Sequence, residues 1–300
     1  MISYYYLILF FIFGIFLQKK LNTKNRFKLI SFLNRFILYI SLPSLIFMHI
    51  SRLTLDKSLL LPFYTAWGVF LFVAILVILI SKIFNWKRDV IVALILTVGL
   101  SNSSFLGFPL TISFFGEDGL PTAIVYDQLG SFLILSTLGL FILSLANNEK
   151  FRFKNVLIKI ITFPSFISLI LATILNINNF PIWSVNILEF LGSMLVILAF
   201  IVIGLNLKLT ISRDDIWIFT FALLFKLIII PILLFVLFKE LNLNNIVSKV
   251  SIFEAAMAPM LTSSLLAILY NIKKDLVSSI LSYGIVLSFF TLPLIFAIIS

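Results

Sequence analysis

The sequence of 300 residues contains no cysteine and a single histidine, His49. Without cysteine, the chain has no disulfide bond, no catalytic thiol and no thiolate-bound metal. One histidine is too few for a histidine cluster around a metal ion. The chain also lacks a glycine-rich phosphate loop, a paired-aspartate metal site and a Ser/His/Asp set. Because an enzyme needs a catalytic group of this kind, we expect neither enzymatic activity nor a bound cofactor.

Charged residues are also scarce, at 11% of the chain, whereas 62% of the residues are hydrophobic. Soluble domains carry about 25% charged residues, so the chain is not an ordinary soluble protein. Its apolar runs are continuous, which favours helices over the alternating strands of a membrane barrel. Since roughly 20 apolar residues cross a bilayer, we expect an all-α polytopic membrane protein with ten spans. The expected spans are 2–18, 28–50, 59–81, 90–115, 120–145, 156–176, 183–206, 215–238, 246–270 and 275–299.

The formal net charge of +10 does not indicate nucleic-acid binding, because the cations lie in short loops between apolar runs. Sixteen of the 22 Lys and Arg residues fall in segments at one side of the predicted membrane. The segments at the other side hold four: Arg52, Lys57, Lys239 and Lys249. Cytoplasmic loops are enriched in cations, so we expect a multi-pass protein of the cell membrane with both termini outside.

The ten expected spans divide into five and five around the basic loop at 147–155. With five spans each, the two halves enter the membrane from opposite sides, which defines an inverted repeat. We therefore expect two repeats, 1–146 and 147–300, and no soluble domain. Pro109 and Pro259, 150 positions apart, weakly support this division.

Two of the expected spans contain residues that interrupt a helix, over Leu100–Pro109 and Phe253–Pro259. Bilayer hydrocarbon offers no water to replace lost backbone hydrogen bonds, so such breaks persist only inside protein or beside a wet cavity. Paired breaks in two halves of a chain indicate the binding site of a transporter, and free amides at a half-helix start suit a carboxylate. The alternative is a proline kink in each packed helix. The expected binding residues are Asn102, Ser103, Gly107, Pro109, Ala258 and Pro259.

Ionisable residues within the spans form a second group of candidates, of which Lys226 lies at mid-span. A charge at this depth needs an anionic partner, because each costs about 2.5–3.5 kcal/mol on insertion scales. That partner is either a permanent internal acid, Asp127 or Glu254, or the carboxylate of a bound substrate. Asp127 and Glu254 are candidate proton carriers and, alternatively, fixed counter-ions. We expect Arg35 and Glu189 to form structural pairs, and His49 to lie at the outer membrane interface.

Short motifs along the whole chain resemble the auxin efflux carrier family, whose bacterial members include malate and malonate permeases. The family belongs to a superfamily that also contains bile acid and arsenite transporters. The motifs are Leu42-Pro43-Ser44-Leu45, Asn102…Gly107-Phe108-Pro109-Leu110, Gly116…Gly119-Leu120, Tyr126-Asp127, Thr137-Leu138-Gly139, Gly204, Ala255-Ala256-Met257-Ala258-Pro259, Leu266-Ala267…Tyr270…Asp275 and Ser288…Thr291-Leu292-Pro293.

The resemblance implies two inverted five-helix repeats whose broken fourth and ninth helices cross at the substrate site. It also implies a scaffold of spans one, two, six and seven, often dimeric, and a mobile bundle of the other six. The cargo would be a small organic anion, moved by an elevator-like shift of that bundle. Asn102, Pro109 and Pro259 would line the crossover, with Asp127 and Lys226 nearby.

The chain departs from the family pattern at Leu129-Gly130, where a polar pair often follows Tyr-Asp, and at the additional acid Glu254. It also lacks the long central loop of plant hormone carriers, so the resemblance does not imply auxin transport. A sodium-coupled symporter of the bile acid type is the alternative function, in which unwound carbonyls would hold the ion. A structural or sensory subunit would not need two breaks at the midplane. Coupling to H⁺ or Na⁺ stays open for either transporter.

Overall fold

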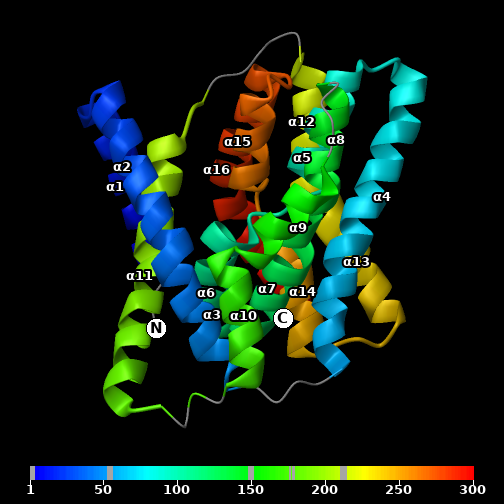
Figure 1. Ribbon diagram of the computed structural model, residues 1–300. Helices are drawn as coiled ribbons and strands as arrows, with labels where there is room; N and C mark the ends of the chain where they lie inside the picture. The colour runs from blue at the N-terminus through cyan, green and yellow to red at the C-terminus, as the bar shows by residue number, and fades with distance from the viewer. Residues whose placement is uncertain (1–3, 53–56, 148–151, 176, 178–179, 210–214) are drawn as a thin grey trace. The chain divides into compact units, whose positions relative to one another are not determined.

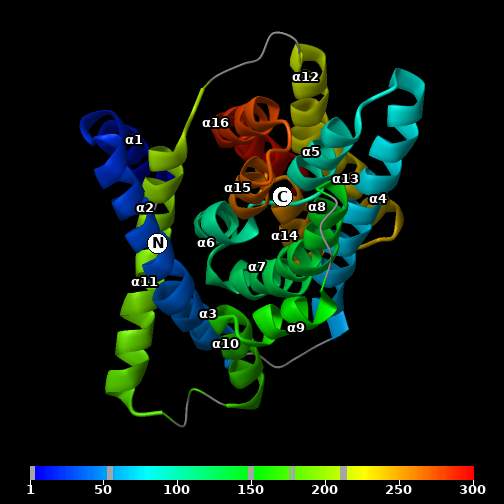
Figure 2. The same cartoon turned by 45° about the horizontal axis from the view of Figure 1, so that its top comes forward.

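The computed structural model describes residues 4–52, 57–147, 152–175, 177, 180–209 and 215–300, and these residues form helices throughout (Figures 1 and 2). In these residues the extended backbone pairs only once, as an isolated antiparallel bridge between Ser101 and Pro259. Residues 148–151, in the loop that divides the predicted repeats, and residues 210–214 lie outside the described residues.

The chain folds into two compact units, and neither unit is a half of the sequence. Unit 1 comprises Met1–Asp56, Ser104–Ile124 and Leu157–Leu207, and unit 2 comprises Lys57–Ser103, Val125–Val156 and Lys208–Ser300. Unit 1 therefore takes up the expected spans one, two, six and seven, which the family resemblance assigns to a scaffold, together with residues 104–124. The division into repeats at residue 146 stays a prediction.

Unit 1 is organised around close packing of its first and last long helices. A Cβ atom on Gly14 of α1 would lie 2.4 Å from the carbonyl oxygen of Ile201, and one on Gly204 of α11 would lie 2.4 Å from that of Phe11. Glycine at these positions lets the two backbones touch, which is a common way for helices to associate in membranes. The elements wholly or mainly in unit 1 are α1 (Tyr4–Lys20), α2 (Thr23–Phe36), η1 (Ile37–Ser41), α3 (Leu42–Ile50), η3 (Ser103–Gly107), α6 (Phe108–Phe115), η4 (Glu117–Gly119), α7 (Leu120–Val125), α9 (Phe153–Ile161), α10 (Pro164–Ile174) and α11 (Ile182–Asn206).

Unit 2 contains the functional candidates Asp127, Lys226 and Glu254 and a continuous apolar core around them. Helix α5 lies near its middle and packs against α4, α8, α12, α15 and α16. The elements of unit 2 are η2 (Lys57–Leu59), α4 (Leu60–Phe84), α5 (Arg88–Val98), η5 (Tyr126–Phe132), η6 (Leu135–Gly139), α8 (Leu140–Ala146), α12 (Ile216–Leu224), η9 (Phe225–Ile229), α13 (Ile230–Glu240), α14 (Ile246–Ala255), α15 (Leu261–Leu269) and α16 (Lys274–Ile299).

Six stretches of continuous helix are long and apolar enough to cross a membrane, and a seventh candidate is bent by 56° between α9 and α10. The bend falls just before Pro164, which cannot continue the hydrogen bonding of α9. The chain is thus a multi-pass membrane protein. Of the remaining expected spans, 2–18 corresponds to the 17-residue helix α1, and 90–115 and 246–270 are interrupted. The six stretches are Thr23–Ile50, Lys57–Phe84, Glu117–Ala146, Ile182–Asn206, Ile216–Glu240 and Lys274–Ile299.

Candidate functional site

The two interrupted helices meet at their breaks within unit 2. The first break separates α5, which ends at Val98, from the helical turn that begins at Ser103. The second separates α14, which ends at Ala255, from α15, which begins at Leu261. The backbone amide of Asn102 donates to the carbonyl oxygen of Ala258 at 2.9 Å, and the amide of Met260 donates to that of Leu100 at 3.1 Å. The backbone of each break therefore pairs with the backbone of the other. Non-helical backbone inside a membrane requires such partners, because no water is available there to satisfy its polar groups.

The first break lies at the start of the predicted range Leu100–Pro109, ahead of its proline. Gly107 and Pro109 lie in continuing helix, where Gly107 caps α6 and Pro109 occupies its first turn. Proline is well tolerated there because the amide it lacks has no partner within the helix. The backbone leaves the helix earlier, at Gly99–Asn102. Gly107 and Pro109 belong to unit 1, whereas the other predicted site residues belong to unit 2.

Further contacts fix the junction between the breaks. A Cβ atom on Gly284 of α16 would lie 2.5 Å from Cδ of Pro259, so glycine at 284 makes room for the proline. The hydroxyl of Ser263 donates to the carbonyl oxygen of Leu96 at 3.0 Å and thereby ties α15 to α5. The side chains at the junction are buried, with Asn102 at 2% exposure. The junction is therefore part of the buried core of unit 2.

Lys226 reaches this junction from η9 and is fully buried. Its ammonium group donates a hydrogen bond of 2.7 Å to Oγ of Ser101, whose hydroxyl donates to the carbonyl oxygen of Ala255 at 3.4 Å. In the part of the chain that the structure describes, no carboxylate is in salt-bridge contact with Lys226; the ion pair there joins Lys273 to Asp215. Burying a charge that has no counter-ion costs several kcal/mol. An anionic ligand beside the Lys226 ammonium group would offset this cost.

Asp127 lies on the other side of Ser103 and is almost fully buried. Its Oδ1 accepts a hydrogen bond of 2.6 Å from the hydroxyl of Ser103, and its Oδ2 accepts one of 2.7 Å from Nε2 of Gln128. The Ser103 hydroxyl also lies 3.1 Å from Oγ of Ser131. The predicted residues Ser103 and Asp127 are thus in direct contact, and Asn102 precedes Ser103 in the chain.

Local backbone geometry sets the direction of both charged side chains. Asp127 lies in the π-helical segment η5 and Lys226 in the π-helical segment η9. Such segments shift the helix register and occur frequently at functional sites. The indole of Trp67 donates to the carbonyl oxygen of Leu129 at 3.0 Å, and Gly130 lets η5 approach Ala66 of α4. The chain departs from the family pattern at Leu129-Gly130, and the same two residues bring η5 against α4.

Two amide atoms near Asp127 have unused hydrogen-bonding capacity. Within the described residues, neither Nδ2 of Asn102 nor Oε1 of Gln128 has a partner, although both side chains are at least 98% buried. A buried polar atom without a partner requires an explanation, and a bound ligand is one. Sequence reasoning did not select Gln128 or Ser131. The signal for Gln128 was its place beside Asp127 in a membrane span.

Glu254 is fully buried in the last turn of α14, where a charge acts on the equally buried Tyr126. The phenol of Tyr126 also interacts with the Ser101 side chain, which itself contacts Lys226. The predicted acid thus lies in the same buried polar region as the predicted lysine, because its charge acts on Tyr126, and Tyr126 interacts with the Ser101 side chain that Lys226 contacts. We call the cluster of Ser101, Asn102, Ser103, Tyr126, Asp127, Gln128, Lys226 and Glu254 the junction site.

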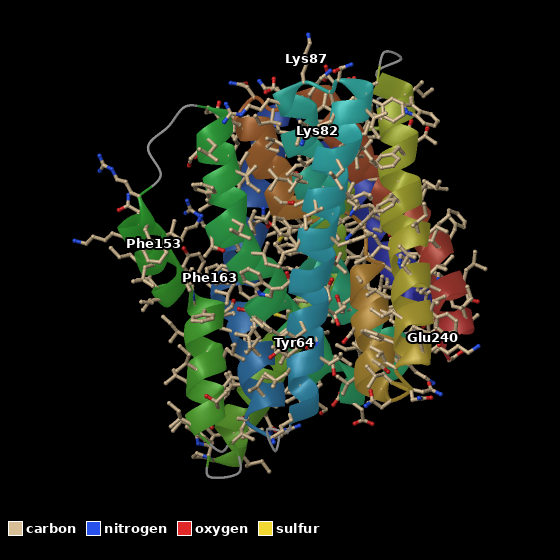
Figure 3. All side chains as sticks on the ribbon, turned by 90° about the vertical axis from the view of Figure 1, so that its right-hand side faces the viewer. Tyr64, Lys82, Lys87, Phe153, Phe163 and Glu240 are labelled. Carbon is tan, nitrogen blue, oxygen red and sulfur yellow. The ribbon has the colours of Figure 1, made fainter. Side chains whose placement is uncertain are left out.

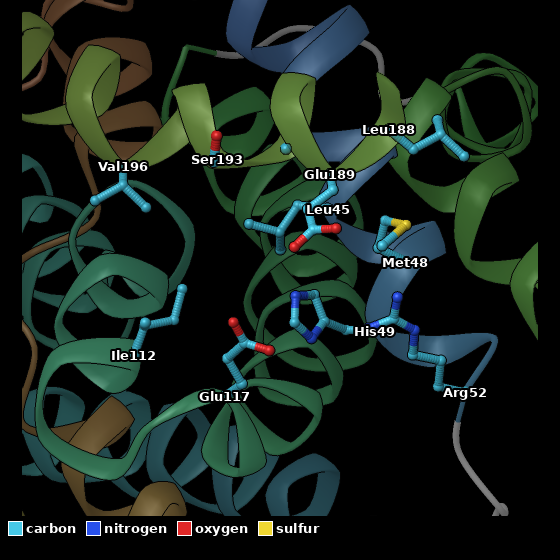
Figure 4. Close-up of a pocket in the computed structure, with 11 residues that line it drawn as sticks. Leu45, Met48, His49, Arg52, Ile112, Glu117, Leu188, Glu189, Ser193 and Val196 are labelled. Atoms are coloured by element: carbon cyan, nitrogen blue, oxygen red, sulfur yellow. The ribbon is translucent and has the colours of Figure 1, made fainter. Parts of the chain in front are cut away.

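A separate pocket of about 200 Å³ lies in unit 1 between α3, η4 and α11 (Figure 4). The His49 side chain points toward the carboxylates of Glu117 and Glu189, with Arg52 beside it. Among the described residues, no group of three His, Asp or Glu side chains is arranged to hold a metal ion. The pocket contains none of the predicted site residues.

A helical membrane protein whose interrupted helices join beside a buried cation has the features of a transporter. The chain matches the family model described as "membrane transport protein" over residues 4–296, and it therefore belongs to this family of membrane transporters. This match confirms the resemblance to the auxin efflux carrier family. The chain is 32% identical over 257 residues to an uncharacterized transporter of Methanocaldococcus jannaschii, covering 82% of each chain. It is 28% identical over 272 residues to an uncharacterized transporter of Methanothermobacter thermautotrophicus, covering 88% of this chain and 87% of the relative.

Proposed function

We propose that this membrane transporter carries a small organic anion, such as malate or malonate, across the cytoplasmic membrane. It acts as a secondary transporter in which a helical bundle moves the bound anion by an elevator-type shift. The ten spans form two inverted repeats, 1–146 and 147–300, with both termini outside. The observation that carries the proposal is the buried ammonium group of Lys226 at the junction of the two breaks, held by the Ser101 hydroxyl.

The other groups around the junction support a carboxylate as the bound group. Nδ2 of Asn102 is a donor without a partner among the described residues, and a carboxylate oxygen is the acceptor it needs. Helix α15 begins after Met260, whose side chain does not cap it. An uncapped helix start offers amide donors and partial positive charge to an anion. Lys226, Asn102 and the start of α15 together supply the donors for one carboxylate.

Gln128 suggests which anion fits best. Its Oε1 is a buried acceptor without a partner in the described part of the chain, and a second carboxylate cannot satisfy it. A hydroxyl group on the cargo can donate to it. We therefore propose that a hydroxylated dicarboxylate such as malate binds better than malonate or succinate, because a site built to hydrogen-bond a hydroxyl rejects analogues that lack one.

Asp127 and Glu254 are the proposed coupling residues. Each is a buried carboxyl group within the junction site, and a buried carboxyl can exchange a proton or bind Na⁺ as the bundle moves. Asp127 is the stronger candidate, because its contact with Ser103 links it directly to the residue next to Asn102. A proton gradient and a sodium gradient distinguish the two coupling ions.

Counterflow in proteoliposomes tests the function. Vesicles preloaded with one unlabelled compound are given the same labelled compound, using a panel of mono- and dicarboxylates, hydroxy acids, amino acids and bile acids. We expect saturable, trans-stimulated uptake of a small dicarboxylate, with malate ahead of malonate. Preferred uptake of a bile acid with a sodium requirement would instead support the bile acid type of symporter. Absence of counterflow with every carboxylate, from protein shown to be folded, would refute an anionic cargo.

A further inference from the structure

An apolar groove runs along the outside of unit 2 between α4 and α13. It encloses about 490 Å³, and both flanking helices also pack against α14. On α4 the lining residues recur every three or four positions, so they share one face of the helix. The lining residues are Leu61, Tyr64, Thr65, Gly68, Val69, Phe72, Ile230, Leu233, Leu234, Leu237 and Phe238.

Gly68 keeps the middle of this groove open. A Cβ atom built on it meets no other atom within 4 Å. The rims are exposed, with Tyr64 at 62%, Phe72 at 45% and Leu237 at 51% exposure. From Leu61 to Phe72 the groove is about 16 Å long at 1.5 Å per residue, roughly half of a 30 Å hydrocarbon core. Its length and lining therefore match one acyl chain within one leaflet.

A basic pocket of about 410 Å³ adjoins one end of the groove, and Phe238 lines both. Its cations are Lys239 and Lys249, and Asn242 and Asn244 add amide groups. The ammonium group of Lys249 donates to the main-chain oxygen of Ser300 at 2.8 Å, which holds it in place. Glu240 follows Lys239 but does not line the pocket. The pocket therefore presents positive charge and amide donors beside an apolar channel.

The placement of Lys239 and Lys249 in the predicted topology agrees with binding of an anion. Figure 3 shows Tyr64 and Glu240 at a similar level, toward the opposite end of the unit from Lys82 and Lys87. In the predicted topology, the end with Glu240 is the external one, where the loops hold only four cations in all. Two of these four line the basic pocket. Cations are disfavoured in external loops, so a bound anion explains why they gather here.

We propose that unit 2 binds one anionic phospholipid of the outer leaflet, with its phosphate at Lys239 and Lys249 and an acyl chain in the α4/α13 groove. Basic pockets between membrane helices are a known way to bind anionic headgroups. The two parts of the site recognise the two parts of one molecule. Phe238, buried at 5% exposure, forms the boundary between headgroup and chain.

Native mass spectrometry of the full chain tests the proposal. The purified protein is equilibrated with equal amounts of phosphatidylglycerol and phosphatidylcholine carrying the same acyl chains, and retained lipid is counted. We expect one retained phosphatidylglycerol per chain, preferred roughly thirtyfold, which corresponds to two lysine contacts. The double variant Lys239→Gln/Lys249→Gln should lose this preference, whereas the control Lys19→Gln/Lys20→Gln should keep it.

A second variant tests the groove independently of the charge. Gly68→Leu adds a side chain where the groove is open, so it should lower retention of both lipids at least tenfold without changing their ratio. The control Ile78→Phe adds bulk to an exposed position of α4 outside the groove and should change neither. Thermal unfolding verifies that each variant is folded.

Three outcomes would overturn the proposal. The first is an unchanged lipid preference in the lysine double variant, and the second is unchanged retention in Gly68→Leu. The third is displacement of phosphatidylglycerol by millimolar inorganic phosphate, which would make the basic pocket a site for free anions. Lipid binding is measured without transport, so the result does not depend on the proposed cargo.

Discussion

Replacing Lys226 with methionine separates the two roles open to this lysine. Methionine retains much of the length of the side chain and removes its charge. If the ammonium group binds the carboxylate of the cargo, the variant loses a buried, charge-assisted contact worth about 3 kcal/mol. Since each 1.4 kcal/mol is a factor of ten, cargo affinity should fall roughly 150-fold. If Lys226 only neutralises an internal acid, the main loss appears in stability instead.

The expected change in stability has the opposite sign for the two roles. Lys226 is held by the Ser101 hydroxyl, and no carboxylate within the described residues is in salt-bridge contact with it. Replacing such a buried charge with an apolar side chain is commonly neutral or stabilising. We therefore expect the thermal midpoint of Lys226→Met in detergent to be equal to or above that of the wild type. Breaking a buried ion pair would lower stability by about 3–5 kcal/mol.

The assay is a thermal-shift titration with the carboxylate identified by counterflow. A ligand that binds the folded state raises the midpoint as its concentration exceeds the dissociation constant, so the titration reports affinity. The exposed Lys82→Met on α4 is the control and should titrate as the wild type does. An unchanged cargo titration in a stable Lys226→Met variant would refute the role of Lys226 in binding.

Four further changes test the junction site. Asn102→Ala removes one donor and should weaken cargo binding about tenfold in the same titration, with the midpoint of the free protein retained. Gln128→Leu removes the proposed hydroxyl acceptor, so counterflow of malate should fall toward that of malonate; an unchanged ratio would remove Gln128 from the site. Asp127→Asn should retain counterflow but abolish uptake driven by an ion gradient, and persistent gradient-driven uptake would exclude Asp127 as the coupling group. Gly284→Val places side-chain atoms against Pro259, so it should lower the thermal midpoint by several degrees; an unchanged midpoint would mean that the junction yields easily.

The sequence predicted the helical class, the family and the two interrupted segments, because each depends on local composition. It predicted less precisely where each break begins. The first break was expected over Leu100–Pro109; the backbone leaves the helix at Gly99–Asn102 and is helical again from Ser103, and Pro109 occupies the first turn of α6. Proline is favoured in a first turn, so Pro109 indicates where α6 starts and not where α5 ends.

The contacts that define the junction site were not predictable from one sequence. Ser101 and Pro259 pair across 158 positions, and Lys226 and Ser101 across 125. No periodicity indicates such contacts. The π-helical segments that carry Asp127 and Lys226 also shift side chains away from their expected face, which a helical period of 3.6 residues does not anticipate.

The place of Pro259 in the bridge determines the register in which the two breaks pair. The hydrogen bonds of the bridge lie on either side of it, at Asn102–Ala258 and Met260–Leu100, so Pro259 occupies a non-hydrogen-bonded position. There its missing amide costs nothing. Any slip of one strand by one residue would bring the proline to a position that needs a donor. The junction thus has a single allowed register, which ties the two broken helices to each other at one fixed point.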